Sequence, residues 1–270
     1  MPKSDETKQS RKAAVDYLAA HLPITIKAFP HLDTDAFTQE LLDHINHPKH
    51  INQGKTDFCG PAGVLYALAK EDPLAYVKFA LDLFVTGHAS VRGWDVDASS
   101  FKNDALPTGG NIGCCDWVTM AAVRTNVGFG TLTSVVNTAS GTLPFEVTSA
   151  FKGMGYRDVR NETYSTIMWK ADEKNLAAAS ALWQQGYRVI LCVNTSMFNN
   201  ADATSIKPNH FCTLKSKVRL ANNISCRVWQ WGKDHKDPQS NLSAIYVDLP
   251  KDQFIKHYFG YVAAGDRPAI

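Results

Sequence analysis

One cysteine of this sequence stands where its thiol can be activated. Residues 53–62 read Gln-Gly-Lys-Thr-Asp-Phe-Cys-Gly-Pro-Ala. Pro61 suits the first turn of a helix, where a missing N–H leaves no bond unmade, so Cys59 is predicted to begin a helix. The free N–H groups and partial positive charge of a helix N-terminus favour the thiolate, the nucleophilic form. The Cys59 N–H and the Gln53 side chain could together stabilise an oxyanion. The alternative is a buried structural cysteine.

A nucleophilic cysteine needs a base, and His210 is the candidate among nine histidines. It opens a predicted strand directly after a polar loop, at a sheet edge where an imidazole can face a helix end. Gln230 ends the next predicted strand, on the face opposite to Trp229. As the third group of a triad, Gln230 would orient the imidazole. An exposed strand-end residue is an equal interpretation of Gln230, and Asp234 and Asn223 are alternatives for the orienting role.

These motifs resemble those of the papain-like superfamily of cysteine peptidases. Gln-x5-Cys-Gly-Pro-Ala is similar to the branch that includes bacteriocin-processing peptidase domains and papain-fold bacterial toxins and effectors. The later His-Phe and Val-Trp-Gln-Trp-Gly segments resemble that family's histidine strand and its neighbour, and all pieces keep the family's order. The resemblance implies an oxyanion donor at Gln53, a nucleophile at Cys59 and a base at His210. The family usually has Asn or Asp at the orienting position, so Gln230 departs from its pattern.

The resemblance also implies an activity. A thiol-dependent hydrolase would cleave an amide or peptide bond of a protein or peptide through an acyl-enzyme, without a cofactor or a metal. Transglutaminases, deamidases and acyltransferases share the thiolate and differ in the acceptor, with water as the default. A catalytically dead papain-like binding module is the alternative of another class. A bacterial toxin or effector would also imply an inhibitor or immunity protein as a partner.

The elements that must hold these residues are predicted as helices first and strands later. Helices are expected over 12–22, 33–45, 59–70, 73–87, 114–126, 144–152, 172–185 and 252–259, and strands over 156–164, 188–194, 209–220, 224–231, 244–249 and 261–264. Residues 2–11 are expected to fray, 88–113 to be rich in turns and 129–144 to form a loop. This order predicts an α+β fold, a helical half packed against a C-terminal antiparallel sheet.

The domain organisation follows from the same order and from the resemblance. We expect a single papain-like domain over 1–270. It would comprise an N-terminal helical segment (1–52), a helical lobe with Cys59 (53–186) and a β-rich lobe with His210 (187–270).

Composition excludes several classes of protein. The 28 Lys and Arg and 26 Asp and Glu residues nearly cancel, and no basic stripe is interleaved with aromatic residues, so no nucleic acid partner is expected. No apolar run approaches the roughly 18 residues of a membrane span, and the charged start lacks the apolar core of a secretory signal. We therefore expect a chain that is cytoplasmic as synthesised, with leaderless export as the route for an effector. None of its six cysteines forms a Cys-x-x-Cys pair, which predicts buried free thiols.

Three histidines have the spacing of metal ligands. His44, His47 and His50 are each three residues apart and could hold a divalent ion. A proline interrupts the helix between them, and no cysteine or carboxylate completes an obvious site, so no metal site is predicted.

The start of the helix at 114 offers the rival nucleophiles. Cys114 and Cys115 lack the preceding glutamine and the following Gly-Pro-Ala, so they rank below Cys59. Trp117 is predicted to pack beneath the site.

Overall fold

The computed structural model divides the chain into two compact units. It describes residues 4–127, 141–164, 171–199, 207–230 and 245–265. One unit consists of Met1–Thr142 with Gly153–Gly155, and the other of Leu143–Lys152 with Tyr156–Ile270. The predicted α+β class is confirmed, because helices and an antiparallel sheet are both present. The units divide at residue 142 and not at the expected 186/187 boundary, since the intervening helices and strand belong with the sheet.

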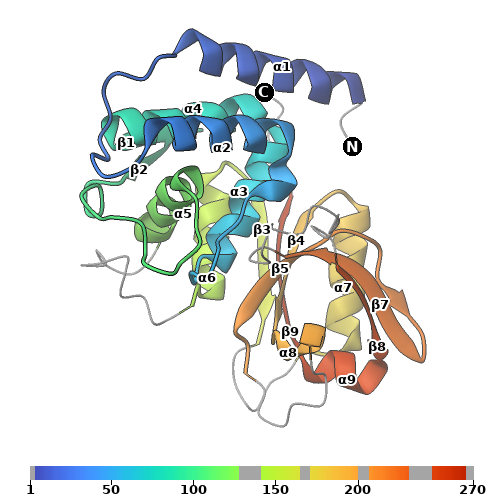
Figure 1. Ribbon diagram of the computed structural model, residues 1–270. Coiled ribbons are helices and arrows are strands. Elements are labelled where there is room, and N and C mark those ends of the chain that lie inside the picture. Colours follow the sequence, from blue (N-terminus) through green and yellow to red (C-terminus); the bar gives the residue numbers. More distant parts are fainter. Residues whose placement is uncertain (1–3, 128–140, 165–170, 200–206, 231–244, 266–270) are drawn as a thin grey trace. The chain divides into compact units, whose positions relative to one another are not determined.

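The first unit is mainly helical (Figure 1). It contains α1 (Ser4–Ala20), α2 (Thr34–Asn46), the 3-10 turn η1 (Pro48–His50), α3 (Cys59–Glu71), α4 (Pro73–Thr86), β1 (His88–Val91), β2 (Trp94–Asp97) and α5 (Cys114–Val127). Helix α4 lies at its centre and packs against α1, α2, α3 and α5. Helix α1 begins at Ser4, so the expectation of a frayed start through residue 11 was wrong. No helix in the described ranges is both long and apolar enough to cross a bilayer.

Local signals set the ends of these helices. The Asp33 side chain caps α2 by accepting a hydrogen bond from the Ala36 N–H at 2.7 Å. Asp72 caps α4 in the same way, through the Ala75 N–H at 3.0 Å. Gly87 ends α4 in the left-handed conformation, with φ of 79°, which glycine adopts without a steric penalty. These helix ends therefore follow from the sequence.

Residues 88–97 form a hairpin that the sequence analysis took for irregular turns. Strands β1 and β2 pair in antiparallel register, with Val91 opposite Trp94. Arg92 and Gly93 between them have φ of 55° and 85°. Positive φ at both central residues is the requirement of the tightest hairpin turn. Asn-Gly and Asp-Gly are its usual sequences, so Arg-Gly gave a weak signal.

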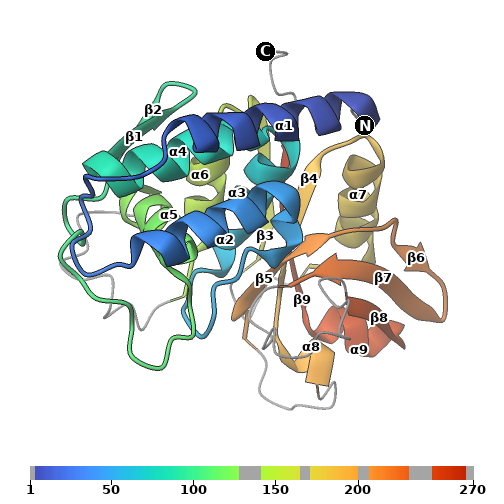
Figure 2. The same cartoon turned by 45° about the horizontal axis from the view of Figure 1, so that its top comes forward.

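In the described part of the second unit, seven strands form one sheet, which Figure 2 shows together with its helices. Its elements are α6 (Pro144–Gly153), β3 (Asp158–Thr163), α7 (Glu173–Gln184), β4 (Arg188–Val193), α8 (Ser196–Asn199), β5 (His210–Leu214), β6 (Arg219–Leu220), β7 (Asn223–Trp229), β8 (Ile245–Pro250), α9 (Lys251–Lys256) and β9 (Tyr258–Gly265). The strand order is β3-β9-β4-β5-β7-β6, β8 pairs with β7, and all pairs are antiparallel. The last strand in the sequence thus lies between β3 and β4.

Strand β4 is buried on both faces. Leu191 and Val193 belong to the hydrophobic core that includes Leu176 of α7. Helix α7 contacts β4 and β9 and therefore covers this face of the sheet. Ile190 and Cys192 point to the opposite face and are also buried. This explains why the segment is continuously apolar instead of alternating.

Candidate functional site

Cys59 is the first residue of helix α3, as predicted. Its side chain is 4% exposed. The next N–H, of Gly60, donates to the Thr142 hydroxyl at 3.4 Å, and that hydroxyl donates to the Asp57 carbonyl at 3.1 Å. Thr142 thus fixes the start of α3 and uses one of its N-terminal N–H groups.

A buried cation near Cys59 was missed by the sequence analysis. Arg124 lies in α5 and is 3% exposed. Burial lowers the pKa of its guanidinium, while attraction to Cys59 and Asp57 opposes this shift. A guanidinium stays charged even so. It attracts a thiolate more strongly in this buried position than it would in water, because the local dielectric constant is low. The signal for it was a cation directly after the mostly apolar run from Trp117 to Val123, on the same predicted helix.

Gln53 sits in a turn held by its own backbone. Its carbonyl accepts hydrogen bonds from the Thr56 N–H at 3.2 Å and the Thr56 hydroxyl at 2.7 Å. Within the described residues, its side-chain Oε1 is buried without a hydrogen-bond partner. The two ends of a carboxamide interchange by rotation. The Gln53 side chain therefore has a buried polar end whose hydrogen-bonding capacity is unused within the described residues.

The loop that carries Gln53 is anchored to α5 and the segment before it. The Asn52 N–H donates to the Asp116 carboxylate at 3.0 Å, and the Lys55 N–H donates to the Gly110 carbonyl at 2.6 Å. Gly54 has φ of +60°, and a Cβ there would lie 2.2 Å from the Gly110 oxygen. Only glycine permits this close approach. The glycine-rich stretch at 109–113 thus packs against the loop.

The rival cysteines lie in surroundings that disfavour the thiolate. Cys115 is fully buried, and burial together with the nearby Asp116 and Glu40 raises the pKa of its thiol well above the usual value. Burial also raises the pKa of Cys114. All six cysteines are free and buried, which confirms the expectation of free thiols.

His210 begins strand β5 in the second unit and pairs with Val193 of β4. Its ring meets the Phe198 ring edge to face, with centroids 6.4 Å apart. Burial lowers the pKa of His210 to about 4, because desolvation disfavours the charged imidazolium. The imidazole is thus neutral at physiological pH, and it is a weaker base than an exposed histidine.

This shift predicts a loss of stability in acid. His210 takes up its proton near pH 6.5 in the unfolded chain but only near pH 4 in the folded one. Between these values the unfolded state binds more protons. The free energy of unfolding therefore decreases as the pH is lowered, by up to about 1.4 kcal/mol per pH unit. Urea unfolding between pH 4 and 7 should show a shallower pH slope for His210→Asn than for the wild type. Equal slopes in the variant and the wild type would contradict the assignment.

The orienting position of the triad has no clear occupant in the described chain. Thr213 of β5 pairs with Trp229 of β7, so the same register brings Gln230 level with Cys212 and not with His210. By alternation Gln230 and His210 still share a face of the sheet.

Asn223 and Asp234 are the two alternatives for the residue that orients His210. Asn223 lies at the opposite end of β7, about 20 Å along the strand from Trp229, where its side chain donates to Asp248 at 3.1 Å. The suggestion that Asn223 orients His210 was therefore wrong. Asp234 lies outside the described residues.

The histidines of the His-x2-His-x2-His spacing separate into two groups. His44 turns into the first unit, where its Nδ1 lies 2.9 Å from the Tyr76 hydroxyl and its Nε2 lies 3.7 Å from the Asp116 carboxylate. His47 and His50 stay at the surface beside Asp43. The expectation that no carboxylate completes the cluster was therefore wrong.

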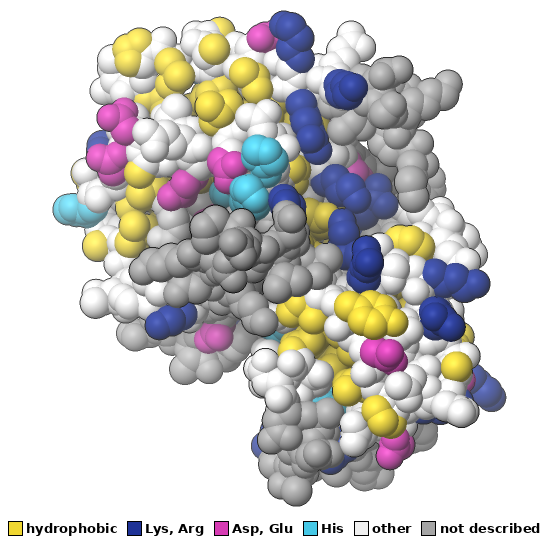
Figure 3. All heavy atoms as spheres, turned by 45° about the vertical axis from the view of Figure 1, so that its right-hand side comes forward, with side chains coloured by type: hydrophobic (Ala, Val, Ile, Leu, Met, Phe, Trp, Pro, Cys, Tyr) yellow, Lys and Arg dark blue, Asp and Glu magenta, His cyan; other side chains and the backbone are white. Residues whose placement is uncertain are grey.

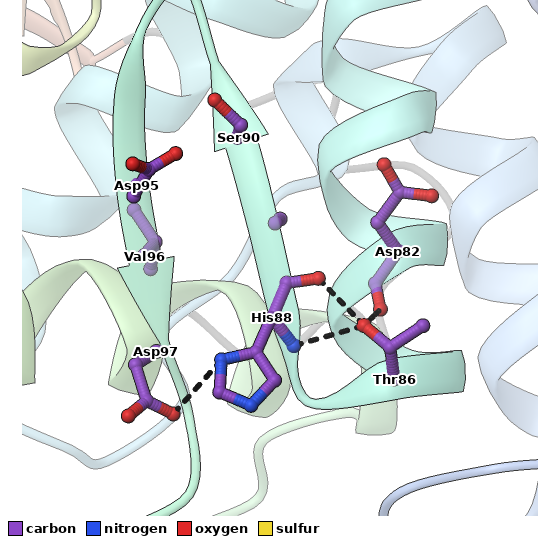
Figure 4. A pocket seen from close by; sticks show the side chains of 8 residues that line it. Asp82, Thr86, His88, Ser90, Asp95, Val96 and Asp97 are labelled. Carbon is purple, nitrogen blue, oxygen red and sulfur yellow. Dashed lines mark hydrogen bonds and ion pairs between the residues drawn. The ribbon is translucent and has the colours of Figure 1, made fainter.

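A second surface feature is a pocket of about 520 Å³ between the end of α4 and the β1–β2 hairpin (Figure 4). Its polar groups bind mainly one another. The Thr86 hydroxyl donates to the His88 carbonyl at 2.7 Å, and the His88 Nδ1 lies 3.4 Å from the Asp97 carboxylate. This pocket is not lined by Cys59 or Gln53.

The predicted site residues are divided between the two units. Gln53, Cys59 and the newly found Arg124 belong to the first, and His210 and Gln230 to the second.

Comparison of the chain with known proteins finds no matching family model, no matching curated protein and no matching solved structure.

Proposed function

We propose that this chain is a papain-like thiol hydrolase that cleaves an amide or peptide bond, with Cys59 as the nucleophile. The observation that carries the proposal is the position of Cys59 at the start of a 13-residue helix, where the buried Arg124 attracts the negative charge of its thiolate. A helix N-terminus and a cation both favour the thiolate. The rival Cys115 has acidic neighbours instead.

The reaction would run through an acyl-enzyme. The Cys59 sulfur attacks the substrate carbonyl, and the oxyanion accepts hydrogen bonds from the Cys59 N–H and the Gln53 carboxamide. By the family resemblance, the His210 imidazole would take the thiol proton and pass it to the leaving amine. Water then attacks the thioester and releases the acid, which regenerates the thiol.

The supports for the two halves of this mechanism differ in kind. For Cys59 and Gln53 they are the helix start, the nearby guanidinium and the buried carboxamide end. For His210, which belongs to the other unit, the support is the resemblance of its strand to the family's histidine strand. In this proposal Arg124, and not an imidazolium, is the cation that favours the resting thiolate.

The first experiment needs no substrate. Iodoacetamide labelling of each cysteine, followed by peptide mass mapping between pH 5 and 9, should show Cys59 reacting at least about tenfold faster than any other cysteine near neutral pH. Arg124→Met should remove most of this advantage, because the thiolate loses its cation. His210→Ala should slow the labelling as well if the imidazole takes the proton.

Cys114 is the matched control, since it too begins a helix of similar length in the same unit. If Cys59 reacted no faster than Cys114, the proposal would be refuted and a binding module would remain. With a reactive Cys59, adding an amine such as dansylcadaverine to a substrate assay distinguishes a hydrolase from a transglutaminase, because only the latter incorporates the amine.

A further inference from the structure

Three side chains at the end of α2 converge on one point of the first unit's surface. The His47 Nδ1 lies 2.9 Å from Asp43 Oδ1, and the His50 Nδ1 lies 2.8 Å from Asp43 Oδ2. One donor atom from each residue lies within 4.8 Å of the other two. The side chains of Asp43, His47 and His50 are 43%, 55% and 38% exposed, respectively. Histidine and acidic side chains are visible together on the face shown in Figure 3.

The local chain geometry produces this convergence. Asp43 and His47 are one helical turn apart, and the His47 N–H closes the helix by donating to the Asp43 carbonyl at 2.6 Å. Pro48 then begins the 3-10 turn η1, in which the His50 N–H donates to the His47 carbonyl at 2.8 Å. The turn redirects the chain and returns the His50 ring to Asp43. The turn that Pro48 begins thus brings His50 into the cluster.

We propose that Asp43, His47 and His50 bind a divalent transition-metal ion such as Zn²⁺. Two imidazole nitrogens and a carboxylate oxygen are a donor set that suits this class of ion better than Ca²⁺ or Mg²⁺. Metal–donor bonds of about 2.0–2.2 Å place tetrahedral ligands roughly 3.3 Å apart. The 2.8 and 2.9 Å separations join the two rings to different oxygens of Asp43, and one donor atom from each residue lies within 4.8 Å of the others. Metal binding therefore requires these exposed side chains to shift until the three donor atoms surround the ion. Each ring carries its proton on Nε2 when Nδ1 binds the metal.

Some charges around this position favour a bound cation, and others oppose it. The C-terminal end of α2 carries a partial negative charge that favours a cation, and the Arg11 guanidinium already donates to the Asn46 carbonyl there at 3.2 Å. Lys49 lies between the two histidine ligands in sequence and opposes a further positive charge. We therefore expect a micromolar site and not a permanently loaded one. Solvent supplies the remaining ligands and the entry path.

Metal binding would tie the end of α2 to η1. His50 is followed by the buried Ile51 and then by the loop held through Asn52 and Asp116. An ion at this site would therefore stabilise the segment that leads into that loop. This consequence for stability does not depend on whether the chain is a hydrolase.

The test is a titration of the untagged, EDTA-treated chain at pH 7.5 with Zn²⁺ by calorimetry and with Co²⁺ by absorption. We expect one ion per chain, Co²⁺ d–d bands of nitrogen and oxygen ligation, and a rise in Tm with Zn²⁺. His47→Ala, His50→Ala and Asp43→Asn should each weaken binding by at least about tenfold. These side chains are at the surface, so the variants should keep their far-UV spectrum.

The matched control is His88→Ala. His88 and Asp97 form another exposed histidine–aspartate pair of the same unit, 3.4 Å apart (Figure 4). Within the described residues this pair belongs to no group of three metal-ligating side chains. The His88→Ala variant should therefore bind the metal like the wild type. The proposal is overturned if no binding saturates at one ion per chain or if His47→Ala and His50→Ala bind as tightly as the wild type. It is also overturned if the Co²⁺ spectrum shows thiolate charge-transfer bands, because the ion would then occupy the cysteines.

Discussion

Replacement of Cys59 by alanine should lower hydrolysis by about 10⁴-fold or more, because no other group of the site can form the acyl-enzyme. The measurement is cleavage of a pooled library of fluorogenic peptide amides by wild type and variant. If the protein acts as a bacterial toxin or effector, the same substitution should also restore the growth of a host that expresses it. Residual cleavage near the wild-type rate would exclude Cys59 as the nucleophile.

Two further variants give this prediction its specificity. Cys114→Ala should retain activity, since Cys114 also begins a helix but burial raises the pKa of its thiol. Gln53→Ala should reduce turnover by about 10²–10³-fold with little change in the fold, which is the usual cost of one oxyanion donor. Unchanged turnover in Gln53→Ala would remove Gln53 from the mechanism and leave Cys59 in it.

Replacement of Trp117 by alanine should give the largest loss of stability in the first unit. Trp117 is fully buried in α5, and its ring lies 5.7 Å from the Phe58 ring and 6.1 Å from the Phe101 ring between centroids. Removal of so large a core side chain costs about 3–5 kcal/mol, which corresponds to about 6–20 °C in Tm for a chain of this size. Calorimetry and urea unfolding measure the change.

Trp117 should also affect the start of α3, because Phe58 is the residue that precedes Cys59 at the helix N-terminus. We expect Trp117→Ala to slow iodoacetamide labelling of Cys59 below its unfolding temperature. Phe84→Ala is the matched control: Phe84 is equally buried, and its ring meets the rings of Phe37 and Phe29, with centroids 3.9 and 6.3 Å away, and not the ring of Phe58. It should destabilise the chain without changing the reactivity of Cys59. Equal labelling rates in both variants would contradict the predicted packing role of Trp117.

The sequence by itself determined the features that depend on neighbours along the chain. Asp33 and Asp72 start their helices because a short side chain satisfies a free N–H three residues away. Gly87 ends α4 because only glycine adopts that conformation without strain. The position of Cys59 at a helix start follows in the same way, from the proline two residues later.

The tertiary structure decided the features that depend on pairing across the sequence. Strand β9 comes last in the chain but lies between β3 and β4, and short apolar strands carry no local mark of their partner. The hairpin at 88–97 was missed because four-residue strands joined by Arg-Gly resemble a turn-rich loop.

The surroundings of the candidate groups were likewise set by tertiary packing. Arg124 was placed beside Cys59 by the packing of α5 on α3, and Asp43 was brought to His47 and His50 by the 3-10 turn after α2. A sequence specifies which groups can do chemistry. Desolvation and the approach of distant charges, which decide whether they do, arise only when the helices pack.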